Sequence, residues 1–231
     1  MSKNKELADY IMDQLSDLGD IRMKERLIRS IMGWLASFTI ALIIVFVLKT
    51  FVGMPTTVKG TSMAGTLYPN DKLFLSTWDV NFNNIPERGA IITFQAPSVE
   101  FLDDTSDCRA IYSSSSRSTW ENFLYYSLGI SNSSYIKRVI GLPGDHIEIK
   151  NDHVYINGNL YKEDYLTNNT KTNMKSGGIC SDIIVPDGCV YVLGDNRNAS
   201  IDSRKFGCIP VGKIEGKVVG RWWPANKTGA V

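Results

Sequence analysis

One apolar run near the N-terminus constrains this chain more than any other feature. It reads IMGWLASFTIALIIVFVLKTFV over residues 31–52, and the 19 residues from Ser30 to Leu48 carry no charge. About 20 apolar residues span a bilayer as a helix. A buried core helix seldom lacks a polar face over such a length, and a cleaved leader would have a shorter apolar region closer to the N-terminus. The sequence therefore predicts a retained transmembrane helix over residues 31–52.

The charges that flank this run predict its orientation. Four basic residues lie just before it, namely Arg22, Lys24, Arg26 and Arg29. Lys49 and Lys59 are the basic residues that follow its apolar centre. Because lysine and arginine accumulate on the cytoplasmic side of a membrane, we expect residues 1–30 to be cytoplasmic and partly helical. Residues 53–231 are then expected to form one extracytoplasmic domain.

The sequence of the outer part predicts a mainly β, antiparallel-sheet domain. Short apolar or alternating runs recur there, at 56–60, 72–76, 90–94, 146–150, 153–157, 189–193 and 217–223. Turn signals such as Asn70-Asp71 and Asn157-Gly158 separate them, as is typical of antiparallel sheets. Residues 98–134 combine a serine run with an aromatic run and are expected to be an insertion.

The composition excludes some classes of partner and leaves the cysteines open. The net charge of +1 provides no strongly basic surface, so nucleic acid is not expected as a partner. No Cys or His spacing is typical of zinc, so no metal is expected. The four cysteines, Cys108, Cys180, Cys189 and Cys208, lie on the predicted outer side, where disulfides persist. They allow three pairings, and a hairpin around Pro186-Asp187-Gly188 could join Cys180 to Cys189.

A serine among small residues is the first candidate for chemistry. KGTSMAGTL, residues 59–67, surrounds Ser62 with side chains that let a substrate backbone come close. A serine hydroxyl is a poor nucleophile until a base takes its proton, and the usual base is histidine. The two histidines, His146 and His153, lie in one predicted hairpin and are expected to be surface residues.

A lysine is the second candidate base. YIKRVIGLPGD, residues 135–145, places Lys137 on the same face of a predicted strand as Tyr135 and Val139. Burial among apolar groups would lower the pKa of this lysine and let the neutral amine accept a proton. Taken alone, the stretch fits a solvated strand lysine better.

A third stretch concentrates charges and hydrogen-bond donors. It reads LGDNRNASIDSRKFG over residues 193–207, and loops with this composition often build a site. One of its hydroxyls could hold the lysine amine. Asp202 and Arg204 could pair and fix the loop.

In this order, the three stretches resemble the sequence boxes of bacterial type I signal peptidases, which are membrane-anchored serine proteases with a serine–lysine dyad. GTSMAGTL resembles the nucleophile box, YIKRVIGLPGD matches the lysine box, and GDNRNASIDSR matches the third box at every fixed position. RGAIITF (88–94) resembles a further family strand. The resemblance covers roughly residues 30–97 and 135–224. It departs from the family at Gly65, where a proline is common, at Ala90, where an aspartate is usual, and at Asn70, where a glycine is usual.

The resemblance implies a role for each matched position. Ser62 would be the nucleophile, Lys137 the general base, and Ser200 the hydroxyl that orients the lysine. The backbone N–H of Ser62 would stabilise the oxyanion. The other implied oxyanion and supporting positions are Gly60, Met63, Arg138, Asp195, Asp202 and Arg204, of which Asp202 with Arg204 and Asp195 with Arg138 would form ion pairs.

The resemblance also implies a function. The expected enzyme removes N-terminal signal peptides from secreted preproteins after small residues, at sites of the Ala-x-Ala type. Its partners would be signal peptides and the lipid bilayer, it would need no cofactor, and it would work as a monomer. Two alternatives are a self-cleaving serine–lysine protease of the repressor type and a catalytically impaired, membrane-tethered binding protein of the same fold.

Overall fold

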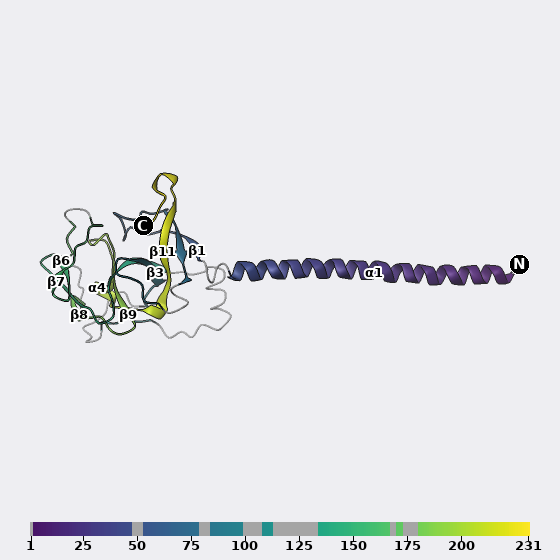
Figure 1. The fold of residues 1–231 in the computed structure, drawn as a ribbon, viewed down its shortest axis with the longest axis horizontal. Helices are drawn as coiled ribbons and strands as arrows, with labels where there is room; N and C mark the ends of the chain where they lie inside the picture. Colours follow the sequence, from purple (N-terminus) through teal and green to yellow (C-terminus); the bar gives the residue numbers. More distant parts are fainter. Residues whose placement is uncertain are drawn as a thin grey trace. The chain divides into compact units, whose positions relative to one another are not determined.

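The computed structural model describes residues 2–47, 53–78, 84–98, 108–112, 134–166, 170–172 and 180–231. The chain divides into two units, Met1–Val47 and Leu48–Val231 (Figure 1). Most of the expected insertion at 98–134 lies outside the described residues, as does most of the polar stretch after residue 166.

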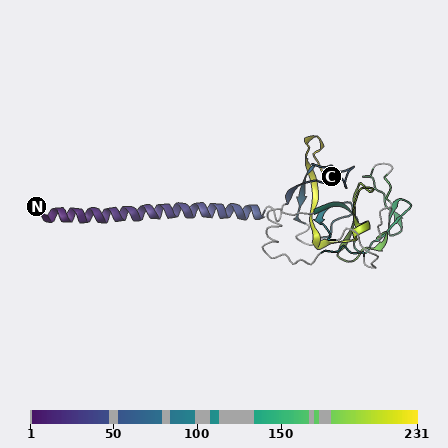
Figure 2. The same cartoon turned by 180° about the vertical axis from the view of Figure 1, so that it is seen from behind.

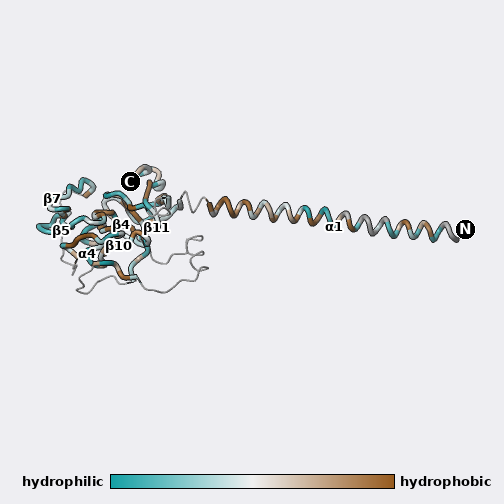
Figure 3. Tube along the Cα trace, turned by 60° about the horizontal axis from the view of Figure 1, so that its bottom comes forward, coloured by the Kyte–Doolittle hydropathy of each residue, from teal (hydrophilic) through white to brown (hydrophobic). Residues whose placement is uncertain are grey.

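The first unit is one long helix, α1 (Ser2–Val47). Within it, Met23–Val45 has a mean hydropathy of 1.9 and is not buried, so by length and composition it can cross a membrane. Figure 3 shows that apolar residues gather in the part of the helix that ends at Val47. Thr39 Oγ1 donates to Leu35 O at 2.8 Å, which satisfies a hydroxyl that an apolar environment would leave unpaired. The helix continues through residues 30 and 31 without a break.

The second unit is mainly β, as expected, and its larger sheet has seven antiparallel strands in the order β1-β2-β11-β3-β4-β9-β10. These are β1 (Met54–Thr57), β2 (Lys72–Ser76), β3 (Ile91–Gln95), β4 (Ser134–Gly141), β9 (Cys189–Leu193), β10 (Ile209–Pro210) and β11 (Ile214–Trp223). Figures 1 and 2 show β11 in yellow, and this strand pairs with β2 on one side and with β3 on the other. The described part of this unit also contains the short helices α4 (Ser203–Phe206), η2 (Val211–Lys213) and η3 (Ala225–Lys227).

The smaller sheet has four antiparallel strands in the order β7-β6-β5-β8. They are β5 (His146–Lys150), β6 (His153–Ile156), β7 (Asn159–Leu160) and β8 (Asp182–Ile184). Asn151 and Asp152 turn β5 into β6 with φ values of 51° and 65°. A two-residue hairpin turn of this kind requires positive φ at both positions, which asparagine and aspartate tolerate.

An apolar cluster fixes the segment that carries Ser62. Met63 and Leu67 are fully buried and pack with residues from β2, β3 and β11. Leu67 N donates to Met63 O at 2.8 Å, so the segment forms a helical turn. Val58 N donates to Asp71 O at 2.9 Å, which closes the base of the loop. The two buried side chains therefore hold Ser62 between β1 and β2.

One disulfide joins distant parts of the second unit. Cys108 and Cys180 are bonded across a sequence separation of 72, whereas Cys189 and Cys208 have buried thiols. The hairpin pairing of Cys180 with Cys189 is therefore wrong. Cys180 leads into β8, which pairs with β5 of the smaller sheet, while Cys189 begins β9 of the larger sheet. The two residues separate because their strands belong to different sheets.

Candidate active site

Ser62 is half-buried at the start of the helical turn between β1 and β2. A second loop, which follows β9, holds its backbone: Asn196 N donates to Ser62 O at 3.0 Å. The side-chain amide of Asn196 also donates to Thr61 O at 3.1 Å. Two segments that are far apart in the sequence thus fix the serine.

Lys137 lies in β4 and reaches the serine hydroxyl. Its Nζ is 2.9 Å from Ser62 Oγ and 3.0 Å from Ile136 O. The residue is only 3% exposed, because β3 and β9 flank β4 in the sheet. The strand therefore carries a buried amine to the one position where it can exchange a proton with Ser62.

Burial changes the protonation of this amine. It lowers the pKa of Lys137 from 10.5 to about 8, and the carboxylates of Asp202 and Asp195 oppose this shift only in part. Both carboxylates are already paired with arginines, which reduces their attraction for the ammonium. With a pKa near 8, about a tenth of the lysine is neutral at pH 7, so a base is available at ordinary pH.

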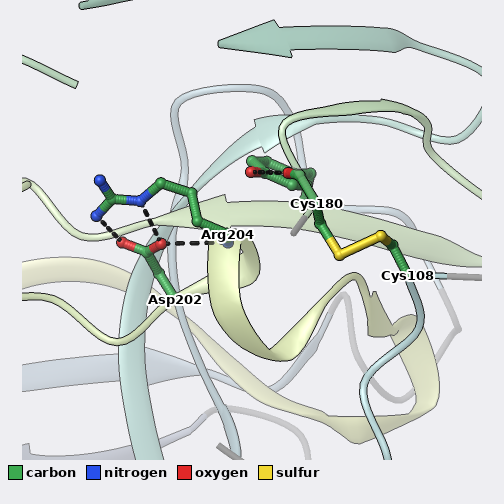
Figure 4. Close-up of a disulfide and its surroundings, with 5 residues drawn as sticks. Cys108, Cys180, Asp202 and Arg204 are labelled. Carbon is green, nitrogen blue, oxygen red and sulfur yellow. Dashed lines mark hydrogen bonds and ion pairs between the residues drawn. A yellow bond between two sulfur atoms is a disulfide. The ribbon is translucent and has the colours of Figure 1, made fainter. Parts of the chain in front are cut away.

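The Asp202–Arg204 pair anchors the loop after β9. Arg204 Nε and Nη2 each donate to Asp202 at 2.8 Å (Figure 4). The same carboxylate accepts from Gly194 N at 3.1 Å and caps α4 through Arg204 N. Because both side chains are buried, the loop cannot lose either partner without leaving a charge unpaired.

The Arg138–Asp195 pair joins three segments. Arg138 donates to Asp195 Oδ1 at 2.9 Å and to Oδ2 at 2.7 Å. Thr66 Oγ1, from the Ser62 turn, donates to the same carboxylate at 2.6 Å. Arg138 also donates to Gly89 O at 2.8 Å. The pair therefore ties β4, the Ser62 turn and the loop after β9 together.

Ser200 lies buried close to the serine backbone. A Cβ on Gly194 would lie 2.2 Å from Ser200 Oγ and 2.6 Å from Ser62 O, so the three residues meet. Among the described residues, Ser200 Oγ has no hydrogen-bond partner. The expected hydrogen bond to Lys137 is not formed in this arrangement, since the amine is directed at Ser62 and the Ile136 carbonyl. The orienting role of Ser200 stays a prediction.

The two remaining predicted positions lie on the Ser62 loop. Gly60 is exposed, and the position of a Cβ on it meets open space. Met63 anchors the turn through its buried side chain, which packs in the apolar cluster with Leu67. The histidines lie elsewhere: His146 Nε2 is 2.6 Å from Asp182 Oδ1 in the smaller sheet, and His153 is exposed. The expectation of surface histidines is confirmed.

One buried cluster was not predicted from the sequence. The Arg197 side chain is fully buried and donates to Glu163 Oε2 at 2.9 Å, to Thr172 Oγ1 and to Gly194 O. Tyr165 OH donates to Glu163 Oε1 at 2.6 Å, and burial, together with the charge of Glu163, raises the pKa of Tyr165. The cluster fastens Glu163, Tyr165 and Thr172 to the loop after β9. No local pattern could have revealed Glu163, because its partner lies 34 residues away.

A polar cleft opens beside the Ser62 turn. The residues that line it are Ala64, Gly65, Tyr68, Tyr165, Leu166, Thr170, Asp195, Asn196 and Asn198. In the described part of the chain, no group of three His, Cys, Asp or Glu residues could hold a metal ion. The chemistry that this site offers is therefore a hydroxyl, an amine of lowered pKa and a cleft beside them.

Comparisons with known proteins converge on one family. The family model described as signal peptidase, peptidase S26 matches residues 31–223. Signal peptidase IB of Staphylococcus aureus (strain COL) is 31% identical over 217 residues, which cover 86% of this chain and 93% of the relative. Signal peptidase I P of Bacillus subtilis subsp. natto is 32% identical over 179 residues, which cover 76% and 79%. A solved signal peptidase I from Enterococcus faecalis V583 is 27% identical and covers 58% of this chain and 97% of that chain, with a TM-score of 0.36.

Proposed function

The chain belongs to the peptidase S26 family of signal peptidases, and we propose that it is a membrane-anchored endopeptidase in which Ser62 and Lys137 remove signal peptides from preproteins. One pair of atoms carries this proposal. Lys137 Nζ lies 2.9 Å from Ser62 Oγ, and burial lowers the pKa of the amine to about 8. A base must lie within about 2.6–3.2 Å of the proton donor that it serves, and this pair meets that requirement.

The reaction follows from the protonation of the pair. Neutral Lys137 takes the Ser62 proton as Oγ bonds to the scissile carbonyl carbon. The ammonium then gives this proton to the leaving amine nitrogen when the peptide bond breaks, which leaves an acyl-enzyme. Neutral Lys137 next takes a proton from water, whose oxygen attacks the ester. The proton returns to Ser62 Oγ when the ester bond breaks, and the signal peptide leaves as a carboxylic acid that gives its remaining proton to the solvent.

The arginines keep the lysine available as a base. Asp202 and Asp195 are buried near the amine, and a free carboxylate there would hold it as an ammonium. Arg204 and Arg138 each neutralise one of them. The net effect is that burial dominates the pKa of Lys137.

The oxyanion is assigned to backbone rather than side-chain donors. We place the developing negative charge at the N–H of Ser62. Gly60 has no hydroxyl to add a second donor. Each such donor is worth about 10²–10³-fold in rate where it is used. Any second donor would have to reach the oxyanion only after the substrate has bound.

Substrate and location follow from the family and from α1. The substrate would enter as an extended strand with small residues before the cleaved bond. Arg22, Lys24, Arg26 and Arg29 precede the apolar run at 31–52, which favours a cytoplasmic N-terminus and a second unit outside the membrane. Ser62 follows Val52 by ten residues, a span short enough to keep the hydroxyl near the outer surface of the bilayer.

The test is cleavage of a preprotein with an Ala-x-Ala site by the full chain in detergent. Wild type should cut after the second alanine, and Ser62→Ala and Lys137→Ala should not. Two variants control for the loss of a serine and of a strand lysine away from the pair: Ser181→Ala before β8, and Lys150→Ala, whose amine pairs with Glu148 on the smaller sheet. Full activity in Lys137→Ala would refute the pair. A folded wild type that binds the preprotein without cutting it would favour the impaired binding protein.

A further inference from the structure

The cleft beside Ser62 starts at the backbone of the nucleophile. Asn196, at its base, donates to both Ser62 O and Thr61 O. Ala64 and Gly65 form its near wall two and three residues after the nucleophile. A peptide that is bonded to Ser62 Oγ therefore has this cleft next to it.

Gly65 gives the near wall a shape that most residues could not adopt. Its φ is +111°, and the position of a Cβ on it meets nothing within 4 Å. Proline holds φ near −65° and cannot take this conformation. The glycine that replaces the common family proline is thus required by the backbone here, and it leaves the space above the wall open.

Tyr165, which lines the cleft opposite its Ala64–Gly65 part, is held in place by buried charges. Tyr165 OH donates to Glu163, which is paired with the buried Arg197. The guanidinium of Arg138 covers the Tyr165 ring at 4.0 Å. Because Arg138 also binds the Asp195 carboxylate that holds Thr66, it connects Tyr165 to the Ser62 turn.

The lining of the cleft has the chemistry of a peptide backbone site. Asn196 and Asn198 offer amide donors and acceptors, Thr170 offers a hydroxyl, and the Asp195 charge is already neutralised. An extended peptide presents donors and acceptors of the same kind. Met63, by contrast, points into the apolar cluster with Leu67 and Ile136, so the apolar and polar sides of this turn are separate.

We infer that this cleft binds the first residues of the mature protein, on the carboxyl side of the cleaved bond, and that Asn198 is a specificity-determining residue there. The inference rests on the proposed function. Small residues before the bond need apolar surroundings, and the cleft is polar. A site that binds the backbone of an extended peptide accepts different side chains after the bond. Asn198 is exposed and lines the cleft.

The experiment compares two peptides with the same signal-peptide half. One ends a single residue after the cleaved bond, and the other continues for six. Wild type should have the larger kcat/KM on the long peptide, chiefly through KM. Asn198→Trp fills the cleft and should lower the long-to-short ratio of kcat/KM by about 3–10-fold, the amount expected when one or two neutral hydrogen bonds are lost. Asn198→Ala should change it in the same direction by less.

Lys162→Ala is the matched control. Its side chain is 85% exposed and pairs with Asp164 on the surface of the same segment, so the ratio should stay at the wild-type value. Equal kcat/KM for the two peptides in wild type, or an unchanged ratio in Asn198→Trp, would overturn the cleft assignment while leaving the proposed function intact. A folded wild type that cuts neither peptide would overturn the proposed function and the cleft assignment with it.

Discussion

The rate of cleavage should follow the titration of Lys137. With a pKa of about 8, the neutral fraction is about 0.1 at pH 7, about 0.5 at pH 8 and about 0.9 at pH 9. If only the neutral amine acts as the base, kcat/KM rises about tenfold from pH 7 to pH 9 and then levels off. A lysine with the ordinary pKa of 10.5 would instead give a rise of about 100-fold over the same interval and no plateau below pH 10.

The assay is kcat/KM between pH 6 and pH 10.5 at constant ionic strength, with a peptide that has no group titrating in this range. Lys137→Arg keeps the positive charge, but arginine does not lose its proton, so this variant should be inactive at every pH. His146→Gln, in the smaller sheet, should keep the wild-type profile. A midpoint above pH 9.5, or residual activity in Lys137→Arg that titrates like wild type, would refute the reasoning.

The same pKa has a consequence for stability. Because the folded pKa lies below the unfolded one, the unfolded chain binds more protons between about pH 8 and pH 10.5, and stability rises with pH across this window. The shift from 10.5 to about 8 corresponds to about 3 kcal/mol. Lys137→Met should therefore be more stable than wild type at pH 7 by up to that amount, with the difference vanishing near pH 10.5. Denaturant unfolding at several pH values measures it.

Two further substitutions test the support of the site. Gly194→Ala places a Cβ 2.2 Å from Ser200 Oγ and 2.6 Å from Ser62 O, and the resulting displacement of Ser62 should lower kcat by about 100-fold. Gly212→Ala, where a Cβ meets open space, should leave kcat unchanged. Normal kinetics in Gly194→Ala would show that the Ser62 turn moves without loss of activity. Cys108→Ser should lower the free energy of unfolding by about 2–5 kcal/mol. Unfolding curves of wild type with and without reductant test this, because reduced wild type should unfold like the variant.

The sequence predicts three of the five-residue strands well because their signals are local. β2, β5 and β9 begin and end at the predicted residues, since alternation and turn residues fix both ends within a few positions. β8 and β10 have three and two residues, too few to show a period. They exist because β5 and β9 supply their partners.

The site is harder to predict because its contacts are long-range. Lys137 and Ser62 are separated by 75 positions, and the strand pattern alone favoured a solvated lysine. Its burial comes from β3 and β9 on either side of β4. The prediction paired the two residues only because the three stretches resemble the family's sequence boxes in the same order. Glu163 lies outside those boxes, so its pairing with Arg197 emerged only from the folded arrangement.

The disulfide divides the residues of the site into those inside and those outside a covalent ring. Residues 108–180 form a covalent ring that contains Lys137 but neither Ser62 nor Asp202. Tyr191 OH and the Arg204 carbonyl then dock on the Cys180 backbone from outside the ring. A chain synthesised from its N-terminus presents Ser62 first, Lys137 second and Asp202, whose carboxylate anchors the loop after β9, last. A nascent chain that ends before residue 137 therefore carries Ser62 without the lysine that would activate it, and one that ends before residue 202 lacks the carboxylate that holds the loop after β9.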